Sequence, residues 1–452
     1  MRGQEVGDQT ARAERQLDLT VGGVVSVAAL ILYSVTLRGD VQAADAGELQ
    51  IAAWTLSIPH PPGYPLYTLL AWMASHLPIG ASPYLRISLL SALTSALGAG
   101  LLAARVAGSR PAGAWTGRLA GLGAGLALAT SVTFWAQATT ANIRSLTALF
   151  SVGLVAAGVA ADLARRIGAE GGSRFGDARA NLLVCAAVLG LGDGHHASLV
   201  FPGAVVGLFV LTAYLRTPAA RTDRVRGLLA AASVLVTCQV VWLLLPLRTD
   251  VPSPLDHGNL ASLNGFLDHA LARGFEGDFF YFVRVVPERL GDRLGLLPQL
   301  FVFQFSPAAL AVMAIGWVGL IWRRTALGLT LAGAMALHLF ITLTYRAPQT
   351  VEYALPAWVI AVAGAGLGIA ATARRGVPIA LGAALLILAS GDGISRFSSF
   401  ALLTADRGDR GMAEAALAVT PQNGTILGQW HQISPIWALQ AIEGIRPDVQ
   451  AR

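Results

Sequence analysis

The stretch DAGELQIAAWTLSIPHPPGYPLYTLL, residues 45–70, is the most informative part of this sequence for its fold class. Two apolar helical segments flank a proline-rich turn, which cannot be helical because proline lacks an amide donor and clashes with the preceding turn. The first segment, 48–56, is amphipathic, and Asp45 and Glu48 lie three apart, on one face. The second, 64–78, has only 15 residues and is too short to span a bilayer. We therefore expect two helices lying at a membrane surface.

The composition of the whole chain supports a membrane protein. Of 452 residues, 54% are hydrophobic and 13% are charged, against roughly 25% charged residues in soluble domains. A soluble fold of this size could not cover its surface with so few charges, so soluble enzymes, coiled coils, disordered chains and disulfide scaffolds are excluded. All 32 basic residues are arginine and they do not form one patch, which argues against nucleic acid as a partner and is typical of bacterial high-GC coding.

The predicted fold class is therefore an all-α polytopic membrane protein. A spanning helix needs about 20 mostly apolar residues, and the first candidate lacks a small-residue cleavage site, so we expect a retained helix rather than a signal peptide. The eleven candidate spans, of which 181–193 is short, are 19–37, 84–104, 119–137, 143–161, 181–193, 197–215, 228–247, 305–322, 326–344, 353–371 and 377–391.

The distribution of arginine predicts the orientation. With the segment 64–78 outside the bilayer and the N-terminus in the cytoplasm, 18 of the 32 arginines fall in short cytoplasmic segments, as the positive-inside rule requires. If 64–78 were a span, the later arginine clusters would lie outside. Of the 26 carboxylates, 18 then lie towards the outer side, which indicates an extracytoplasmic working surface.

Three long outer segments carry this surface: residues 38–83, 248–304 and 392–452. We expect residues 1–391 to form a transmembrane domain in the cytoplasmic membrane of a bacterium. The remainder, 392–452, is a small extracytoplasmic α/β tail that is too short to form a core alone. Its predicted elements are a helix at 409–419, a strand at 425–429 and a helix at 434–443.

The polar residues of the outer side allow more than one interpretation. Asp45 and Glu48 suit a helix N-terminus, where the macrodipole favours anions, but a carboxylate beside a rigid turn can also act as a general base. Adjacent histidines, as in the turn LGDGHHASL (191–199), rarely bind one metal, so hydrogen bonding or phosphate contact is favoured over a metal site, with plain interfacial histidines as the alternative. Arg248 suits a lipid phosphate or a simple interfacial anchor.

With these motifs identified, the chain resembles the transmembrane protein 260-like protein O-mannosyltransferases, of the GT-C glycosyltransferase superfamily. The most specific motif is HPPGYPLY, residues 60–67. The resemblance covers nearly the whole chain, and its further segments are FWAQATTANIRSLTALF (134–150), LGLGDGHHASLVFPG (189–203), LPLRTDVPSPLDHGNLASLNGFLDHAL (245–271), TVEYALPAW (350–358), PQNGTILGQW (421–430) and GIRPDV (444–449).

The resemblance implies a GT-C-type fold and a reaction. A sugar, a hexose such as mannose, would move with inversion from a polyprenyl-phosphate carrier to an acceptor hydroxyl of a protein serine or threonine. Asp45 takes the position of the family's base, with Glu48 as its motif partner. The leaving phosphate needs positive charge or hydrogen-bond donors, and the candidates are His60, Tyr64, Arg144, His195, His196 and Arg248. Acceptor or accessory roles fall to Asn142, Asp193, Asp256, His257, Tyr345 and Glu352.

The residues identify no resident cofactor, and a divalent metal is an open alternative without support in the sequence; the lipid-linked sugar is the expected donor substrate. The expected partners are the lipid bilayer, the polyprenyl-phosphate sugar and a protein or glycan acceptor. Two alternatives remain open: the same chemistry on a lipid or cell-wall glycan, and a transporter or flippase of lipid-linked sugars. Transporters carry intramembrane charges at the midplane, whereas this chain gathers its charges at the outer face, which favours an enzyme.

Overall fold

The computed structural model describes residues 2–109, 114–169, 175–254, 257–347, 349–372 and 376–452, and most of them are helical. In chain order the helices are α1 (Arg2–Ser34), α2 (Asp45–Thr55), α3 (Pro65–Ser75), α4 (Pro83–Ala107), α5 (Ala114–Ala129), α6 (Val132–Ala138), α7 (Arg144–Ala169), α8 (Phe175–Asp193), α9 (Val200–Arg216), α10 (Arg221–Cys238), α11 (Leu244–Leu247), α12 (Leu263–Ala270), α13 (Tyr281–Arg284), α14 (Leu290–Leu294), α15 (Leu297–Gln304), α16 (Pro307–Arg323), α17 (Thr325–Thr344), α18 (Thr350–Tyr353), α19 (Leu355–Ala371), α20 (Val377–Thr404), α21 (Gly408–Val419) and α22 (Trp430–Ala438). Short 3-10 or π turns are η1 (Ala197–Leu199), η2 (Gln239–Leu243), η3 (Arg273–Asp278), η4 (Pro287–Arg289) and η5 (Leu439–Glu443), and the strands are β1 (Thr425–Ile426) and β2 (Gln450–Ala451).

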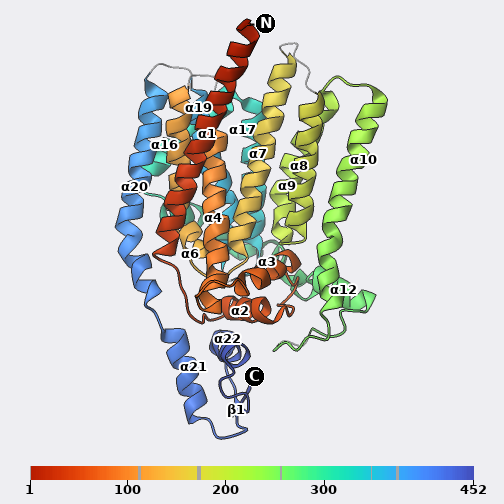
Figure 1. Cartoon of the computed structure of the whole chain (residues 1–452), viewed down its shortest axis with the longest axis vertical. Coiled ribbons are helices and arrows are strands. Elements are labelled where there is room, and N and C mark those ends of the chain that lie inside the picture. The colour runs from red at the N-terminus through yellow and green to blue at the C-terminus, as the bar shows by residue number, and fades with distance from the viewer. Residues whose placement is uncertain (1, 110–113, 170–174, 255–256, 348, 373–375) are drawn as a thin grey trace.

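The long helices form one bundle, and every predicted span falls on a helix of it (Figure 1). Within the described residues, seven helices are long and apolar enough to cross a membrane, or nine if each of two bent pairs counts as one span. The two further predicted spans are α8 and α19. Helix α8 packs beside α7, α9 and α10, and α19 is buried along its whole length among α5, α7, α16 and α17. The predicted polytopic all-α fold is therefore confirmed.

Two predicted spans are not straight. The segment 119–137 is broken between α5 and α6, which meet at 68°, because the Thr130 and Ser131 hydroxyls turn back to backbone carbonyls of the preceding turn. A second bend of 108° separates the segment that ends with α15 from α16, which begins at Pro307. Helix α20 continues past the predicted span 377–391 to Thr404, so its last turns lead directly towards the tail.

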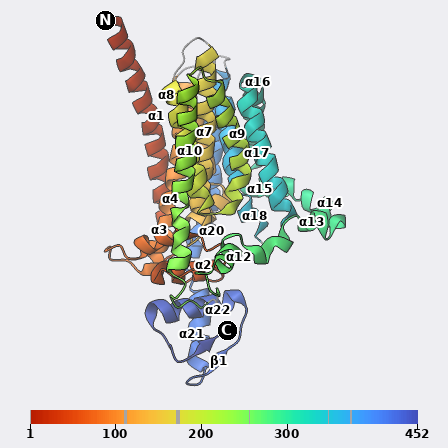
Figure 2. The same cartoon turned by 90° about the vertical axis from the view of Figure 1, so that its right-hand side faces the viewer.

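Close helix contacts in the bundle depend on small residues. At the crossing of α16 and α19, a side chain on Gly368 would collide with the backbone carbonyl of Gly316. Such contacts are typical of membrane helices, where burial of apolar surface does not distinguish a neighbouring helix from lipid and close packing drives association. On α1, the side chains of Leu19, Val27 and Ile31 remain exposed, which suits a helix that faces lipid at the edge of the bundle (Figure 2).

The predicted surface helices gather at the end of the bundle opposite the N-terminus (Figures 1 and 2). Helices α2 and α3 pack against each other there, as the sequence predicts. The aromatic run at 275–282 does not form one helix, because the positive φ of Phe280 separates η3 from α13. The structure thus places the proline turn, α12 and the tail around one end of the bundle.

The part of the tail that follows α20 contacts α2 through α22 and η5. Its strands β1 and β2 pair in parallel, with Thr425 opposite Gln450, so the expected α/β character is present. The predicted strand 425–429 is shorter, and the predicted helix at 434–443 begins earlier, at Trp430. The reason is a capping box in which the side chains of Gln429 and Gln432 satisfy the first backbone amides.

Candidate functional site

Glu48 holds the proline turn against helix α2. The carboxylate lies in the first turn of the helix and is 5% exposed. Its Oε1 accepts a hydrogen bond from the backbone amide of His60 at 2.5 Å, and its Oε2 lies 2.5 Å from the ring Nδ1 of the same residue. One carboxylate therefore fixes both the turn and the orientation of the imidazole ring, so Glu48 acts on the site through His60.

The His60 ring extends this contact to Tyr64 and His196. Its Nε2 lies 2.9 Å from the Tyr64 hydroxyl, and the Tyr64 ring stacks on His196 with ring centroids 5.8 Å apart. Tyr64 has a φ of 43°, in the left-handed region, immediately before α3 begins. Glu48, His60, Tyr64 and His196 thus form one continuous set of contacts, which we call the relay.

The two histidines of the relay favour different protonation states. Burial lowers the pKa of His60, but the hydrogen bond and charge of Glu48, aided by the charge of Asp45, outweigh it and raise that pKa above its ordinary value. Burial, followed by neighbouring positive charges, holds the pKa of His196 well below its ordinary value. When both nitrogens of His60 carry protons, Nε2 donates to the Tyr64 oxygen, and the Tyr64 hydroxyl is free to donate elsewhere.

The relay borders a cavity of about 420 Å³ that lies between the proline turn and the helices α8, α9, α12, α17 and α18. Its lining combines many aromatic and aliphatic side chains with a few polar groups, as is usual for sites that bind small molecules. The polar lining residues are His60, Tyr64, Asp193, His196, Ser198, His338, Thr342, Tyr345 and Tyr353, and large apolar ones include Phe201, Trp242, Phe266, Leu267, Leu271, Phe275, Phe279 and Ile341. The cavity therefore suits a ligand with both a polar group and an apolar part.

Asp45 begins α2 and is half-buried. Its Oδ1 accepts a hydrogen bond of 2.9 Å from the indole Nε1 of Trp430 in the tail. No hydrogen bond to its Oδ2 is present among the described residues. The N-cap of α2 is Ala44, and no side chain makes the capping hydrogen bond, so neither Asp45 nor Glu48 caps the helix by direct contact. Among the described residues, Asp45 thus has one oxygen in a hydrogen bond and one without, and Asp45 is not among the residues that line the cavity.

Arg144 is buried behind the cavity wall. Its Nε lies 2.8 Å from Glu352 Oε2, its Nη2 lies 2.6 Å from Gln349 Oε1, and its guanidinium lies over the Tyr353 ring, 4.4 Å from the centroid. Asn142 accepts the backbone amide of Arg144 at 2.8 Å and caps the start of α7. Arg144 therefore packs against Tyr353, which lines the cavity. Asn142 caps the first turn of α7.

His195 and Arg248 both contact backbone carbonyls, and the His195 Nε2 also lies 3.0 Å from the Thr147 hydroxyl oxygen. The Nε2 of His195 lies 2.9 Å from the carbonyl oxygen of Ile143, and burial lowers the pKa of this histidine to about 3. Arg248 donates from Nε to the carbonyl of Leu56 at 2.9 Å and from Nη2 to that of Thr55 at 3.1 Å, at the C-terminal end of α2. Neither residue is among those that line the cavity. The geometry gives both a structural role, and their contact with phosphate stays a prediction.

The remaining predicted residues divide between the cavity and its surroundings. Tyr345 and Asp193 line the cavity, whereas His257 packs edge-on against His269, with centroids 5.0 Å apart, beside the proline turn. Asp256 lies outside the described residues. In the part of the chain that the structure describes, no three His, Cys, Asp or Glu side chains are arranged to hold a metal ion.

Two residues at the site do not follow from the sequence motifs. His338 lies inside the apolar helix α17 and contributes to the cavity lining; a lone histidine within a predicted span is itself a signal of a functional position. Trp430 contacts Asp45 across 385 positions of sequence, and no local pattern reveals such a pairing.

Comparison with known proteins supports the family resemblance. Residues 45–218 match the family model of the protein O-mannosyl-transferase TMEM260 N-terminal domain. The chain is 39% identical over 142 residues to protein O-mannosyl-transferase TMEM260 of Mus musculus, covering 30% of this chain and 18% of that protein. It is 43% identical over 51 residues to the Dictyostelium discoideum protein of the same name, covering 11% and 6%. The matches thus span less than a fifth of either relative.

Solved structures confirm the fold. ArnT from Cupriavidus metallidurans bound to undecaprenyl phosphate superposes with a TM-score of 0.58 at 13% identity, covering 95% of this chain and 89% of that one. Its apo form gives a TM-score of 0.57 at 14% identity, with the same coverage. At such low identity the similarity establishes a common GT-C-type fold and nothing finer.

Proposed function

We propose that the chain is a polyprenyl-phosphate-sugar-dependent glycosyltransferase, a proposal supported by the match of residues 45–218 to the TMEM260 N-terminal domain model and by the fold that the chain shares with ArnT. The donor is a hexose such as mannose on a polyprenyl phosphate, and the acceptor is a protein serine or threonine hydroxyl. The reaction takes place at the extracytoplasmic face of a bacterial cytoplasmic membrane. The single observation that carries the proposal is the relay at the edge of a mixed polar and apolar cavity, with Glu48 of the relay in the same first turn of α2 as Asp45.

In the proposed reaction Asp45 is the general base. Its Oδ2 takes the proton of the acceptor hydroxyl while the acceptor oxygen forms a bond to the anomeric carbon of the donor. The bond between that carbon and the phosphate oxygen breaks on the opposite face, and the phosphate leaves with the electron pair, so the configuration inverts. A positioned base of this kind contributes about 10²–10⁴-fold to a rate.

The relay supplies hydrogen bonds to the leaving phosphate. Protonated His60, oriented by Glu48, donates to Tyr64, whose hydroxyl then donates to the phosphate inside the cavity. Donors fixed before the reaction stabilise a developing charge without reorganising during it. In this scheme Glu48 is a positioning residue and not a second base, and the apolar cavity wall accommodates the first isoprene units of the carrier.

The test is sugar transfer by the purified chain in lipid nanodiscs from radiolabelled polyprenyl-phosphate mannose or glucose to an acceptor peptide. Asp45→Asn should lower kcat at least 100-fold. The control is Asp223→Asn, which changes an exposed carboxylate that is paired loosely with Arg226 at 3.7 Å, and it should transfer like the wild type. Equal turnover in Asp45→Asn and the wild type would exclude Asp45 as the base.

The acceptor class has its own readout. Transfer to a lipid or glycan but not to peptide would keep the chemistry and replace the acceptor. The transporter is tested with the chain in sealed vesicles that have the lipid composition of the nanodiscs. If the labelled donor crosses the vesicle membrane and no sugar is transferred to any acceptor, the enzyme proposal is overturned in favour of a transporter.

A further inference from the structure

The tail contributes a side chain to the first carboxylate of α2. The indole Nε1 of Trp430 donates to Asp45 Oδ1 at 2.9 Å. Trp430 is the first residue of α22, and both residues are half-buried where the two helices pack together. A hydrogen bond from a neutral donor to a carboxylate is charge-assisted and therefore strong and directional, so it restricts the rotation of the Asp45 side chain.

The tail is built to hold this indole in place. The capping box of Gln429 and Gln432 fixes the start of α22 at the tryptophan itself. The Trp430 ring packs edge-on against Trp437, with centroids 5.8 Å apart, and the Trp437 indole donates to the carbonyl of Ala451 at 3.0 Å. The position of Trp430 is thus determined by α22 and by the strand pair behind it.

Helix α22 also approaches α2 closely. A side chain on Gly47 would lie 3.1 Å from the Ser434 hydroxyl oxygen and would collide with the backbone carbonyl of Gln42. Glycine at this position, two residues after Asp45, is what lets the two helix backbones approach. The contact between the tail and α2 is therefore a packed interface and not a single hydrogen bond.

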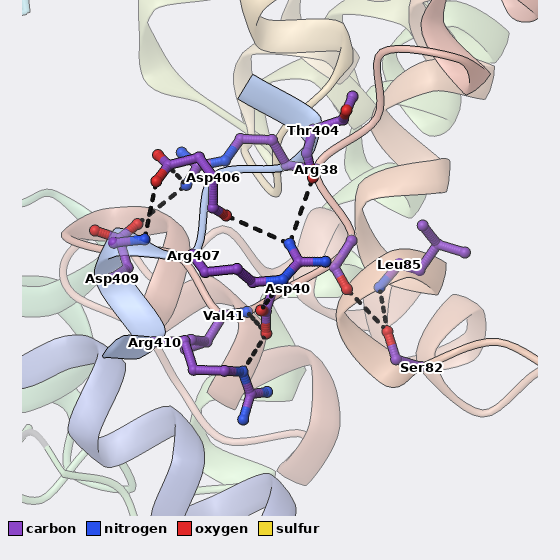
Figure 3. Close-up of polar contacts among 12 residues, drawn as sticks. Arg38, Asp40, Val41, Ser82, Leu85, Thr404, Asp406, Arg407, Asp409 and Arg410 are labelled. Carbon is purple, nitrogen blue, oxygen red and sulfur yellow. Dashed lines mark hydrogen bonds and ion pairs between the residues drawn. The ribbon is translucent and has the colours of Figure 1, made fainter. Parts of the chain in front are cut away.

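Ion pairs connect the tail to the segment before α2 (Figure 3). Arg410 donates from Nε to Asp40 Oδ1 at 2.7 Å, and Arg407 lies 3.2 Å from the other oxygen of Asp40. Asp409 accepts from Arg38 at 3.2 Å and from the backbone amide of Ala43 at 3.1 Å. These contacts fix the segment that leads into Asp45.

We propose that Trp430 is a positioning residue for Asp45 and that the tail is an integral part of the active site. The indole holds Oδ1 and so presents Oδ2 to the acceptor hydroxyl. The inference rests on the proposed function for the role of Asp45 as base, while the contact itself is open to a measurement that needs no substrate.

The kinetic arm compares Trp430→Phe with the wild type and with Trp322→Phe, a matched change at a tryptophan that is 74% exposed at the end of α16. Phenylalanine keeps an aromatic ring and removes the donor. We expect Trp430→Phe to lower kcat about 10-fold, which corresponds to a rise of about 1.4 kcal/mol in the activation free energy when Asp45 is less well oriented. The KM for the donor should stay within about twofold of the wild-type value. Trp322→Phe should match the wild type. An unchanged kcat in Trp430→Phe overturns the proposal.

The second arm is ¹⁹F NMR of protein labelled with 5-fluorotryptophan at its ten tryptophans. The resonance missing from Trp430→Phe identifies Trp430. It should move in Asp45→Ala, which removes the acceptor, and move less in Asp45→Asn, which keeps a carbonyl oxygen; Asp223→Asn should leave it in place. An identical resonance in Asp45→Ala and the wild type overturns the contact. If the wild type transfers no sugar, the proposed function fails, and this arm still decides whether Trp430 holds Asp45.

Discussion

Replacing Glu48 by glutamine removes a charge from the centre of the relay while keeping its size. The carboxylate accepts two hydrogen bonds of 2.5 Å from His60, one from the backbone amide and one from the ring. Glutamine can still accept the first with its carbonyl oxygen, but it loses the ionic contact with the ring. One charge-assisted hydrogen bond contributes about 1.5–3 kcal/mol, so we expect Glu48→Gln to lower the free energy of unfolding at pH 6 by ~2–3 kcal/mol.

The effect should depend on pH in a definite direction. Burial opposes protonation of His60, but Glu48 raises the pKa of that histidine overall. A raised pKa in the folded state gives stability that is fully present below the unfolded value of about 6.5 and is lost as pH rises through the folded value. The deficit of Glu48→Gln should therefore be largest at pH 6 and should shrink at pH 9.

The assay is reversible unfolding in mixed detergent micelles, followed by circular dichroism at both pH values. The control is Glu414→Gln, which changes a half-exposed carboxylate paired with Arg410 within α21, and exposed pairs of this kind contribute about 0.3–0.5 kcal/mol. A deficit of the same size at pH 6 and pH 9, or none at all, would show that the charge of Glu48 does not hold a protonated His60.

Three further outcomes follow from the packing around the site. Arg248→Ala should destabilise the protein by about 1–2 kcal/mol, because two carbonyls at the end of α2 lose their donors; Arg248→Lys should recover part of this in the same unfolding assay. Gly368→Leu should abolish the sharp melting transition and Gly391→Leu, in open space, should not, as seen by thermal scanning fluorimetry. Because the pKa of His195 is lowered by burial to about 3, the wild type should lose up to about 1.4 kcal/mol per pH unit below pH 6.5 relative to His195→Gln.

The relay explains why the proline motif has its composition. The chain must leave α2, turn back and enter α3 within a few residues. The prolines of the motif exclude a helical backbone at His60. The turn brings the His60 ring onto Glu48, twelve positions earlier, and onto Tyr64, four positions later. A flexible linker of the same length would lose much of this orientation, because each ordered residue costs about 1–2 kcal/mol of backbone entropy.

The tail changes how the domain boundary near residue 391 is to be understood. Helix α20 runs on to Thr404, and the following residues join the segment before α2 through the ion pairs of Arg407, Asp409 and Arg410. Residues 392–452 do contain the expected small α/β element. They also contact Asp45 through Trp430, so under the proposed role of Trp430 the boundary near residue 391 does not separate two independent functional units.

The sequence alone determined the architecture and the position of the first carboxylates. Apolar runs of bilayer length give helices wherever they occur, because a backbone in lipid must satisfy its own hydrogen bonds. Likewise, Asp45 and Glu48 share a face of α2 through the helical repeat. These are local properties, in which each residue interacts with near neighbours in sequence. The predicted spans therefore lie on helices, and the differences are the bends at Thr130 and before Pro307 and the extension of α20 to Thr404.

Only the tertiary structure decided how the two carboxylates differ. Glu48 contacts His60 because the turn brings the imidazole onto it, whereas Asp45 accepts from Trp430, which reaches it from 385 residues away. Contacts at such separation depend on how whole helices pack, and a side chain carries no local signal of which distant group it will meet. Sequence therefore determined which residues stand at this end of the bundle, and packing determined which of them face one another.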